Sequence, residues 1–262
     1  MYSEKVKKLA AHLSDAAKRG QGVEPPTEIE PNINIDEAYY IQLYNIEQEV
    51  KNGARVTGKK IGLTSKAMQE LLGVNEPDYG HLLDHMEVKN GGTIPFDRVL
   101  QPRVEAELAF ILKEDLRGPD VSVMDVLLAT EAIVPAIEIV DSRVKDWKIT
   151  LADTIADNAS SGLYILGDTY KKVSEIDRKQ IGMALYKNDE LQNTGVGAAA
   201  LGDPAKCVAW LANKLSQYDI PLKAGEIVLS GALSAAVDAR PGDHFRAKFS
   251  GLGEVHVTFS EA

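Results

Sequence analysis

Cysteine is almost absent from this sequence, since Cys207 is the only one among 262 residues. A single cysteine excludes a disulfide framework and a cysteine-rich metal site, and it is typical of a protein from a reducing compartment. Long apolar runs are missing as well: each is interrupted within about ten residues, whereas a helix that spans a bilayer needs about 20. Residues 1–19 alternate lysines with apolar residues and lack the uncharged core of a secretory signal. We therefore expect a cytoplasmic protein without a membrane partner.

Positive charge is also in deficit, because 29 lysines and arginines stand against 39 aspartates and glutamates, for a net charge of -10. Nucleic acids are bound mainly through clustered lysine and arginine, so this balance argues against a nucleic-acid partner. A small anionic substrate is still compatible with it, because a bound divalent cation can reverse the local field. The serines lack a nucleophile-elbow context and the glycines form no dinucleotide fingerprint, so the sequence indicates neither a serine hydrolase nor a Rossmann enzyme.

The first quarter of the chain has a helical pattern, and the rest is mostly strand-like. Residues 3–19 have the pattern of a surface helix, and a second helix begins after Asn34, an N-cap with Glu37 three residues later. From Arg55 onward, short apolar runs separated by turn residues are typical of strands. These runs occupy residues 55–63, 104–112, 133–140, 163–166, 181–187, 226–233, 244–249 and 254–259, and helical patterns interrupt them at 66–72, 122–130 and 204–217.

This order of elements predicts an α+β fold in which small helices flank a large, mainly antiparallel sheet or β-roll. We expect an N-terminal helical portion, residues 1–54, and a β-rich catalytic body, residues 55–262, that together form one compact unit.

Two glutamates stand out in the strand-like segment 103–112. Side chains alternate along a strand, so Glu105 and Glu107 share one face with Ala109 and Ile111. Residues two apart on a strand have Cα atoms roughly 7 Å apart, so two buried carboxylates there would repel each other and be costly to desolvate. This segment alone is equally compatible with an edge strand that has one solvated face.

A third glutamate, Glu138, favours the buried alternative, because it lies between Ile137 and Ile139 in the apolar segment 133–140. A buried glutamate is almost never unpaired. Three carboxylate ligands suit Mg²⁺ or Mn²⁺, whereas zinc is not favoured because no histidine or cysteine accompanies the set. We expect the three carboxylates to converge and, without metal, at least one of them to have a pKa raised by like-charge repulsion.

Several further segments resemble one enzyme family. The chain is similar to the 2-hydroxypenta-2,4-dienoate hydratases (2-keto-4-pentenoate hydratases) of aromatic meta-cleavage pathways and to the related 4-oxalocrotonate decarboxylases, in the fumarylacetoacetase-like superfamily. The similarity runs in order from about residue 4 to the C-terminus, and the segments that carry it are 58–65 (GKKIGLTS), 77–80 (PDYG), 102–107 (PRVEAE), 153–160 (DTIADNAS), 229–233 (LSGAL) and 241–243 (PGD).

The resemblance implies a fumarylacetoacetase-type mixed β-roll with N-terminal helices. It also implies a cofactor, Mg²⁺ or Mn²⁺, with Glu105, Glu107 and Glu138 as its ligands. Members of the family are homo-oligomers, and the decarboxylases form a complex with the hydratase. We therefore expect a homo-oligomer that acts on a small 2-keto acid, and a complex with a neighbouring pathway enzyme is conceivable.

Lys60 and Asp78 are the candidate catalytic residues. A lysine near a bound keto acid can hold its carboxylate or move a proton, although the residues alone favour one of two adjacent surface lysines. Asp78 follows Pro77 in a turn context, where capping is a common role. The resemblance points to a base for water, because hydratases carry aspartate at this position and decarboxylases an apolar residue.

Three further residues are assigned to substrate binding, namely Leu63, Ser160 and Ser230. Ser160 ends a short polar segment and could donate to the substrate carboxylate, or could equally belong to a buried loop that satisfies its own backbone. Ser230 ends an apolar strand with small neighbours, as where a backbone approaches a ligand. Asp141 and Arg143 are expected to form a structural ion pair.

The function implied is that of a lyase that adds water to 2-hydroxypenta-2,4-dienoate to give 4-hydroxy-2-oxopentanoate. The first alternative is a 4-oxalocrotonate (2-oxo-3-hexenedioate) decarboxylase. The second is a hydratase for a longer 2-oxo-enedioate, whose distal carboxylate would need a further cation such as Lys59 or Arg103. A scaffold without activity is disfavoured because all three glutamates are present.

Overall fold

The structure is a computed structural model that describes residues 2–71 and 73–261. Its N-terminal helices form as the sequence predicts, because each has its own capping residues. The Ser3 side chain accepts from the Val6 amide at the start of α1 (Glu4–Arg19), and Gly20 ends that helix with a left-handed φ of 63°. Asn34 and Glu37 form a capping box at the start of α3 (Ile35–Lys51), and α2 (Pro26–Ile29) is a single short turn between the two helices.

The larger sheet of the described residues has eight strands in the order β2-β1-β10-β5-β6-β7-β3, and β11 pairs with β5 beside this path. Its pairings are antiparallel except for β1 with β10 and β3 with β7. The strands are β1 (Val56–Gly62), β2 (Asp78–Leu83), β3 (Glu87–Val88), β5 (Arg103–Leu112), β6 (Thr130–Val140), β7 (Ser161–Leu166), β10 (Ile227–Leu229) and β11 (Val237–Asp238).

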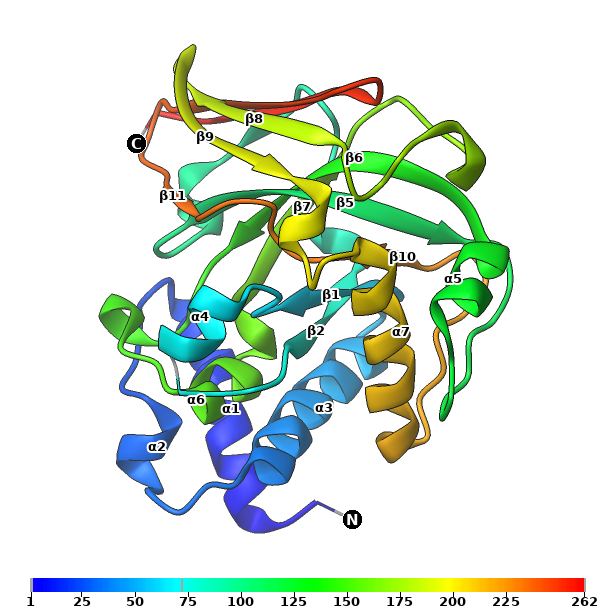
Figure 1. Cartoon of the computed structure of the whole chain (residues 1–262). Helices are drawn as coiled ribbons and strands as arrows, with labels where there is room; N and C mark the ends of the chain where they lie inside the picture. Colours follow the sequence, from blue (N-terminus) through cyan, green and yellow to red (C-terminus); the bar gives the residue numbers. More distant parts are fainter. Residues whose placement is uncertain (1, 72, 262) are drawn as a thin grey trace.

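A smaller sheet lies on the side of β5 and β6 opposite the N-terminal helices (Figure 1). In the described part of the chain it has five strands in the order β4-β13-β12-β8-β9, all antiparallel except β4 with β13. The strands are β4 (Thr93–Ile94), β8 (Gly182–Lys187), β9 (Glu190–Val196), β12 (His244–Phe249) and β13 (Gly253–Phe259).

Short helices flank the strands, and all but α6 lie where the sequence predicts a helix. They are α4 (Lys66–Leu71), α5 (Val123–Ala129), α6 (Leu151–Ala156) and α7 (Pro204–Leu215). The predicted helix 66–72 thus matches α4, and residue 72 lies outside the described residues. Figure 1 shows α1, α3 and α6 grouped below β1 and β2, with α5 and α7 beside the sheets. The predicted α+β fold with a mixed β-roll and N-terminal helices is confirmed.

Several elements were not predicted from the sequence, among them the helices α2 and α6, the short strands β3, β4 and β11, and the longer strands β2 and β9. Asp78 was expected in a turn, but it is the first residue of β2, whose six residues are all buried. The segment has a low strand propensity, because Pro77 precedes it and Gly80 and His81 lie within it. Its pairing with β1 along its whole length determines its conformation. Strand β9 was missed as well, because most of its side chains are exposed and polar and show no apolar alternation.

One hydrophobic cluster joins the helical portion to the sheets, because it includes Leu9 of α1, Tyr39 of α3 and Phe110 of β5. The division into residues 1–54 and 55–262 stays a prediction. Among the described residues, no helix combines the length and the apolar character needed to cross a membrane.

Candidate metal centre

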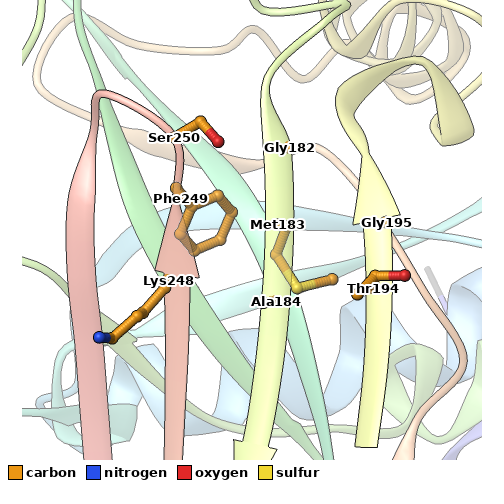
Figure 2. Close-up of a pocket in the computed structure, with 8 residues that line it drawn as sticks. All are labelled: Gly182, Met183, Ala184, Thr194, Gly195, Lys248, Phe249 and Ser250. Carbon is orange, nitrogen blue, oxygen red and sulfur yellow. The ribbon is translucent and has the colours of Figure 1, made fainter. Parts of the chain in front are cut away.

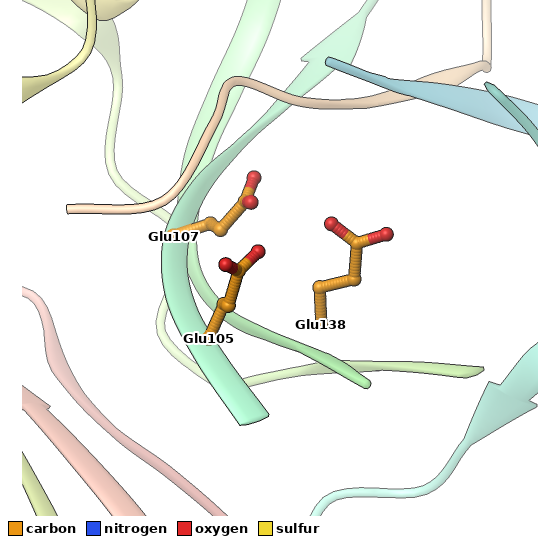
Figure 3. Close-up of side chains that lie close together, drawn as sticks. All are labelled: Glu105, Glu107 and Glu138. Carbon is orange, nitrogen blue, oxygen red and sulfur yellow. The ribbon is translucent and has the colours of Figure 1, made fainter. Parts of the chain in front are cut away.

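Three glutamates converge on one face of the larger sheet. Strands β5 and β6 are antiparallel neighbours, and their register places Glu105 directly opposite Glu138. Glu107 lies two residues further along β5, so it points to the same face as Glu105. Each of the three offers a carboxylate oxygen within 4.8 Å of the others, and Figure 3 shows the carboxylates turned toward one another.

The three carboxylates are held where their charges are costly. Glu107 and Glu138 are fully buried, and Glu105 is partly exposed. Burial, followed by repulsion from Glu138, raises the pKa of Glu105 to about 7 and that of Glu107 well above its usual range. Burial also raises the pKa of Glu138, although Lys60 opposes it. The raised pKa values agree with expectation, but desolvation contributes more than the like-charge repulsion on which the expectation rested.

Glu107 is oriented by a backbone amide. The Gly231 amide donates to Glu107 Oε2 at 2.8 Å, which leaves Oε1 buried and without a partner in the described structure. Gly231 has a φ of 107°, and a Cβ added there would lie 2.3 Å from Thr64 Oγ1. Only glycine fits this position, so the close approach of the backbone after β10 serves to hold Glu107.

Lys60 supplies positive charge to the cluster. It lies on β1, is 3% exposed, and its Nζ is 3.1 Å from Glu138 Oε1. Burial alone would lower the pKa of this lysine, but the carboxylates around it, Glu138 first, raise the pKa above its usual value. One lysine cannot balance three glutamates and an aspartate when all four are ionised, so the ionised cluster has a negative excess that a divalent cation would offset.

Asp78 faces the same interior from β2, where it pairs with Gly62 of β1. A Cβ added to Gly62 would lie 2.2 Å from Asp78 Oδ1 and 3.6 Å from Lys60 Nζ, so this glycine leaves room for both side chains. Burial raises the pKa of Asp78 to about 6 although Lys60 opposes the shift, and its Oδ1 has no hydrogen-bond partner among the described residues. A carboxyl with this pKa can exchange a proton near neutral pH.

The three residues assigned to substrate binding have different surroundings. Ser230 is buried and donates through its hydroxyl to the Leu108 carbonyl at 2.8 Å, so its side chain serves the β10–β5 junction. Leu63 is half-buried and has a left-handed φ of 56°. The Ser160 hydroxyl is 3.2 Å from Thr154 Oγ1 and 3.5 Å from Asp157 Oδ2. Their roles toward a substrate stay predictions.

Ser161 is a residue that the sequence analysis missed. It pairs with Val140 of β6, and its hydroxyl lowers the pKa of the Glu138 carboxyl. The sequence shows two adjacent serines, and only the first of them was taken as a candidate. The signal would have been the polar segment that ends at Ser160, read one residue further.

The predicted ion pair between Asp141 and Arg143 is wrong. The Arg143 Nε lies 2.5 Å from Asp157 Oδ1, whereas the Asp141 carboxylate accepts from the backbone amides of Leu100 and Gln101. Adjacent sequence positions suggested the pairing, but the chain turns after β6 and brings Asp157 to the guanidinium instead.

The two cations considered for a distal carboxylate are already paired. Lys59 lies on the other face of β1 from Lys60, and its Nζ is 2.6 Å from Glu226 Oε1. The Nε of Arg103 is 2.9 Å from Asp238 Oδ1, and its guanidinium lies 4.3 Å from the ring centre of Trp147. Lys59 is therefore not available to a second substrate carboxylate, whereas the Arg103 pair lies at the surface, with 38% of the Arg103 side chain and 79% of the Asp238 side chain exposed.

A surface hollow over the smaller sheet offers no comparable chemistry. Figure 2 shows Gly182 and Met183 of β8 between Phe249 of β12 and Thr194 of β9, with Lys248 at the side. The lining described for this hollow contains one charged side chain, that of Lys248, and no carboxylate or histidine. The glutamate cluster is therefore the better candidate for a functional site.

The mixed β-roll and the three converging carboxylates together make this protein a candidate metal-dependent enzyme. The family model described as fumarylacetoacetate (FAA) hydrolase C-terminal matches residues 61–260, and the chain belongs to this family. A 2-hydroxypent-2,4-dienoate hydratase from Pseudomonas putida is 48% identical over 82% of this chain and 97% of the relative. A 2-oxo-hept-4-ene-1,7-dioate hydratase from Escherichia coli is 40% identical over 96% of each.

A solved structure is similar over almost the whole length. It is the 4-oxalocrotonate decarboxylase from Pseudomonas putida G7, complexed with magnesium and adipate. Its TM-score is 0.95 at 34% identity, and the match covers 98% of this chain and 97% of that one. The relatives named here are lyases, in agreement with the reaction class expected from the sequence.

Proposed function

We propose that this protein is a metal-dependent hydratase that adds water to 2-hydroxypenta-2,4-dienoate, giving 4-hydroxy-2-oxopentanoate in the meta-cleavage degradation of aromatic compounds. One observation carries the proposal: three carboxylates converge beside a buried lysine and a buried aspartate, and two of the three, Glu107 and Glu138, are fully buried with oxygens that accept no hydrogen bond from the described residues. The 48% identity to a hydratase of this substrate class supports the choice of reaction.

The donor set fits a hard divalent cation. Glu107 Oε1 and Glu138 Oε2 are buried and accept no hydrogen bond from the described residues, and Glu138 Oε1 lies 3.1 Å from Lys60 Nζ, so these oxygens can serve as ligands. Oxygen-only ligation by carboxylates suits Mg²⁺ or Mn²⁺, and Glu105, Glu107 and Glu138 would hold the ion. When bound, the ion supplies a Lewis acid that favours negative charge on the C2 oxygen of the keto acid.

Asp78 and Lys60 would handle protons and the substrate. Asp78 faces the same interior as the glutamates but belongs to β2, so it is free to orient or deprotonate the water that adds at C4. Its pKa of about 6 leaves it mostly ionised, and thus basic, at neutral pH. Lys60 would anchor the substrate or donate a proton, and it offsets part of the charge on Glu138. Leu63, Ser160 and Ser230 remain our candidates for substrate contacts.

Decarboxylation of 4-oxalocrotonate is the second candidate, favoured by the structural similarity to the decarboxylase. The structure gives two arguments against it. The carboxylate of Asp78 would repel a second carboxylate of a substrate bound beside it, and the buried Lys59 is already paired with Glu226. The second argument also disfavours a longer dioate as the substrate of a hydratase.

Product analysis tests the proposal. The purified protein, supplied with Mg²⁺ or Mn²⁺, should consume 2-hydroxypenta-2,4-dienoate and form 4-hydroxy-2-oxopentanoate. In separate reactions, 4-oxalocrotonate should release little CO₂ and 2-oxohept-4-ene-1,7-dioate should be hydrated poorly. Release of CO₂ together with an inert pentadienoate would establish the decarboxylase instead.

A homo-oligomer, a complex with a neighbouring pathway enzyme and the cytoplasmic location stay predictions. Light scattering of the purified protein, alone and mixed with candidate pathway enzymes, measures the first two.

A further inference from the structure

The segment between α6 and β7 has an unusual backbone. Asn158, Ala159 and Ser160 have φ values of 56°, 50° and 52°, so three successive residues other than glycine lie in the left-handed region. Side chains disfavour this conformation, and it persists only where the surroundings hold it. Such backbone strain is concentrated at functional sites, and this turn leads directly into Ser161, the residue beside Glu138.

Arg143 holds both ends of this turn with one guanidinium group. Its Nε donates to Asp157 Oδ1 at 2.5 Å and its Nη2 to the Asp157 carbonyl, at the start of the turn. Its Nη1 donates to the Ser161 carbonyl at 2.8 Å, at the end of the turn, and to the Asp141 carbonyl at 2.6 Å. The planar fork of arginine spans these acceptors, which the single ammonium of lysine could not.

Asn158 fixes the middle of the turn to the sheet. Its Nδ2 donates to the His81 carbonyl at 2.9 Å, and its Oδ1 accepts from the His81 amide at 2.8 Å. The Asn158 side chain thereby forms with β2 the pair of backbone hydrogen bonds that a neighbouring strand would form. Gly80 permits the approach, because a Cβ there would lie 2.3 Å from the Asn158 carbonyl oxygen. The turn is therefore held from two sides.

This arrangement aims the Ser161 hydroxyl at Glu138. Ser161 pairs with Val140, which lies two residues after Glu138 on the same face of β6. Its Oγ is buried and makes no hydrogen bond of regular geometry with the described residues, so it is free to turn toward Glu138, whose pKa it lowers. Glu107 has a fixed donor in the Gly231 amide, and the Ser161 hydroxyl is the neutral donor beside Glu138, which also faces Lys60.

We propose that Arg143 is a positioning residue that acts through Ser161: it holds the left-handed turn 158–160 so that the Ser161 hydroxyl orients the Glu138 carboxylate for a divalent cation. The inference rests on the proposed function, because it needs Glu138 as a metal ligand. Groups that orient metal ligands typically contribute about 10–100-fold to metal affinity.

The test is a double-mutant cycle on Mn²⁺ affinity, measured by calorimetry on metal-free protein. Ser161→Ala should weaken Mn²⁺ binding by about 10–100-fold while leaving the melting temperature nearly unchanged, because the hydroxyl makes no hydrogen bond of regular geometry with the described residues. Arg143→Lys should weaken binding to a similar extent. If Arg143 acts through Ser161, the double variant should bind Mn²⁺ no worse than Ser161→Ala alone.

Arg178→Lys is the matched control. Arg178 also pairs with a buried aspartate, since its Nε donates to Asp203 Oδ1 at 2.7 Å and its side chain is 16% exposed, against 14% for Arg143. This variant should lose thermal stability as Arg143→Lys does, yet bind Mn²⁺ like the wild type.

The outcomes separate this inference from the function on which it rests. If the wild type binds no Mn²⁺, the proposed function and this inference are both wrong. If the wild type binds Mn²⁺ and Ser161→Ala binds it equally well, or if the losses from Ser161→Ala and Arg143→Lys multiply in the double variant, this inference alone is overturned. Equal losses of affinity in Arg143→Lys and Arg178→Lys would also overturn it, because they would indicate a general loss of structure.

Discussion

Two adjacent lysines on β1 lie in opposite kinds of surroundings. Lys59 points to one face of the strand, where its Nζ lies 2.6 and 2.7 Å from the two carboxylate oxygens of Glu226. Lys60 points to the other face, where it meets Glu138 at 3.1 Å and lies among Asp78, Glu105 and Glu107. Burial lowers the pKa of Lys59, whereas the excess of carboxylates raises that of Lys60.

The difference teaches how to tell a structural charge from a functional one. The Lys59 pair is closed, because one cation matches one carboxylate and both oxygens are used. The Lys60 cluster is open, because its carboxylates outnumber the lysine and several of their oxygens have no partner among the described residues. Breaking a closed pair should cost stability, and altering an open cluster should cost function.

The largest effect is expected from Glu107→Gln in the open cluster. The change keeps the shape of the side chain but removes a ligand charge, and since a metal ion contributes several kcal/mol to catalysis, we expect activity to fall by at least about 10³-fold. The melting temperature of the metal-free protein should hold steady or rise, because like-charge repulsion is relieved. Steady-state assays and calorimetry measure the two quantities, and a large loss of metal-free stability would show that the cluster is a structural ion network.

Asp78→Asn should lower the rate of water addition by about 10²–10⁴-fold, the usual contribution of a general acid or base. Mn²⁺ affinity should be unchanged, because Asp78 lies on β2 and is not among the three proposed ligands. The variant should still convert the dienol into the unsaturated ketone, since that step needs no water-directed base. Ultraviolet progress curves and product analysis measure both steps. Formation of hydrated product at the wild-type rate would contradict the role proposed for Asp78.

Glu226→Gln breaks the closed pair and should mainly affect folding. Lys59 would then be buried without a counter-charge, and the free energy of unfolding should fall by about 3 kcal/mol. The kcat of the folded protein should stay close to that of the wild type, because Glu226 lies on the other side of β1 from the glutamate cluster. Denaturant unfolding and activity assays test this expectation, and a loss of kcat without a loss of stability would contradict the contrast between the two lysines.

Metal affinity should depend on pH, as the smallest of these effects. Glu105 has a folded pKa of about 7, above its usual 4.5, so the metal-free folded state binds more protons than the unfolded state between these values. Its contribution to metal-free stability therefore decreases as pH rises from 4.5 to 7. Mn²⁺ requires ionised ligands, so its affinity should increase by up to about tenfold per pH unit for each carboxyl that is still protonated, and the raised pKa of Glu107 should extend the increase above pH 7. If the Mn²⁺ affinity did not change between pH 5.5 and 8, then no carboxyl with a raised pKa would take part in binding.

The sequence was sufficient to predict where the three glutamates lie, but it was insufficient to predict the residues and the turn that surround them. Alternation along 103–112 and the lone glutamate in 133–140 placed Glu105, Glu107 and Glu138 on buried strand faces, because strand periodicity is local. The strand that carries Asp78 could not be predicted, since its pairing with β1 outweighs its own weak propensity. The left-handed turn before Ser161 was also beyond prediction, because Arg143 and Asn158 stabilise it through residues distant in sequence.

The same limit explains the wrong partner for Arg143. Sequence proximity suggested Asp141, but a guanidinium pairs with the carboxylate that the fold brings to it, here Asp157. Lys59 and Lys60 illustrate the point again, because nothing in their adjacent positions shows which of the two meets one carboxylate and which meets four.

The central claim is that Glu105, Glu107 and Glu138 together hold a divalent cation, and crystals soaked in Mn²⁺ test it most directly. An anomalous difference map should show one strong peak per chain about 2.0–2.6 Å from a carboxylate oxygen of each glutamate. The peak should disappear in Glu138→Gln crystals grown and soaked in the same way. A map without a peak among the three glutamates, or with its strongest peak at other residues, would contradict the account.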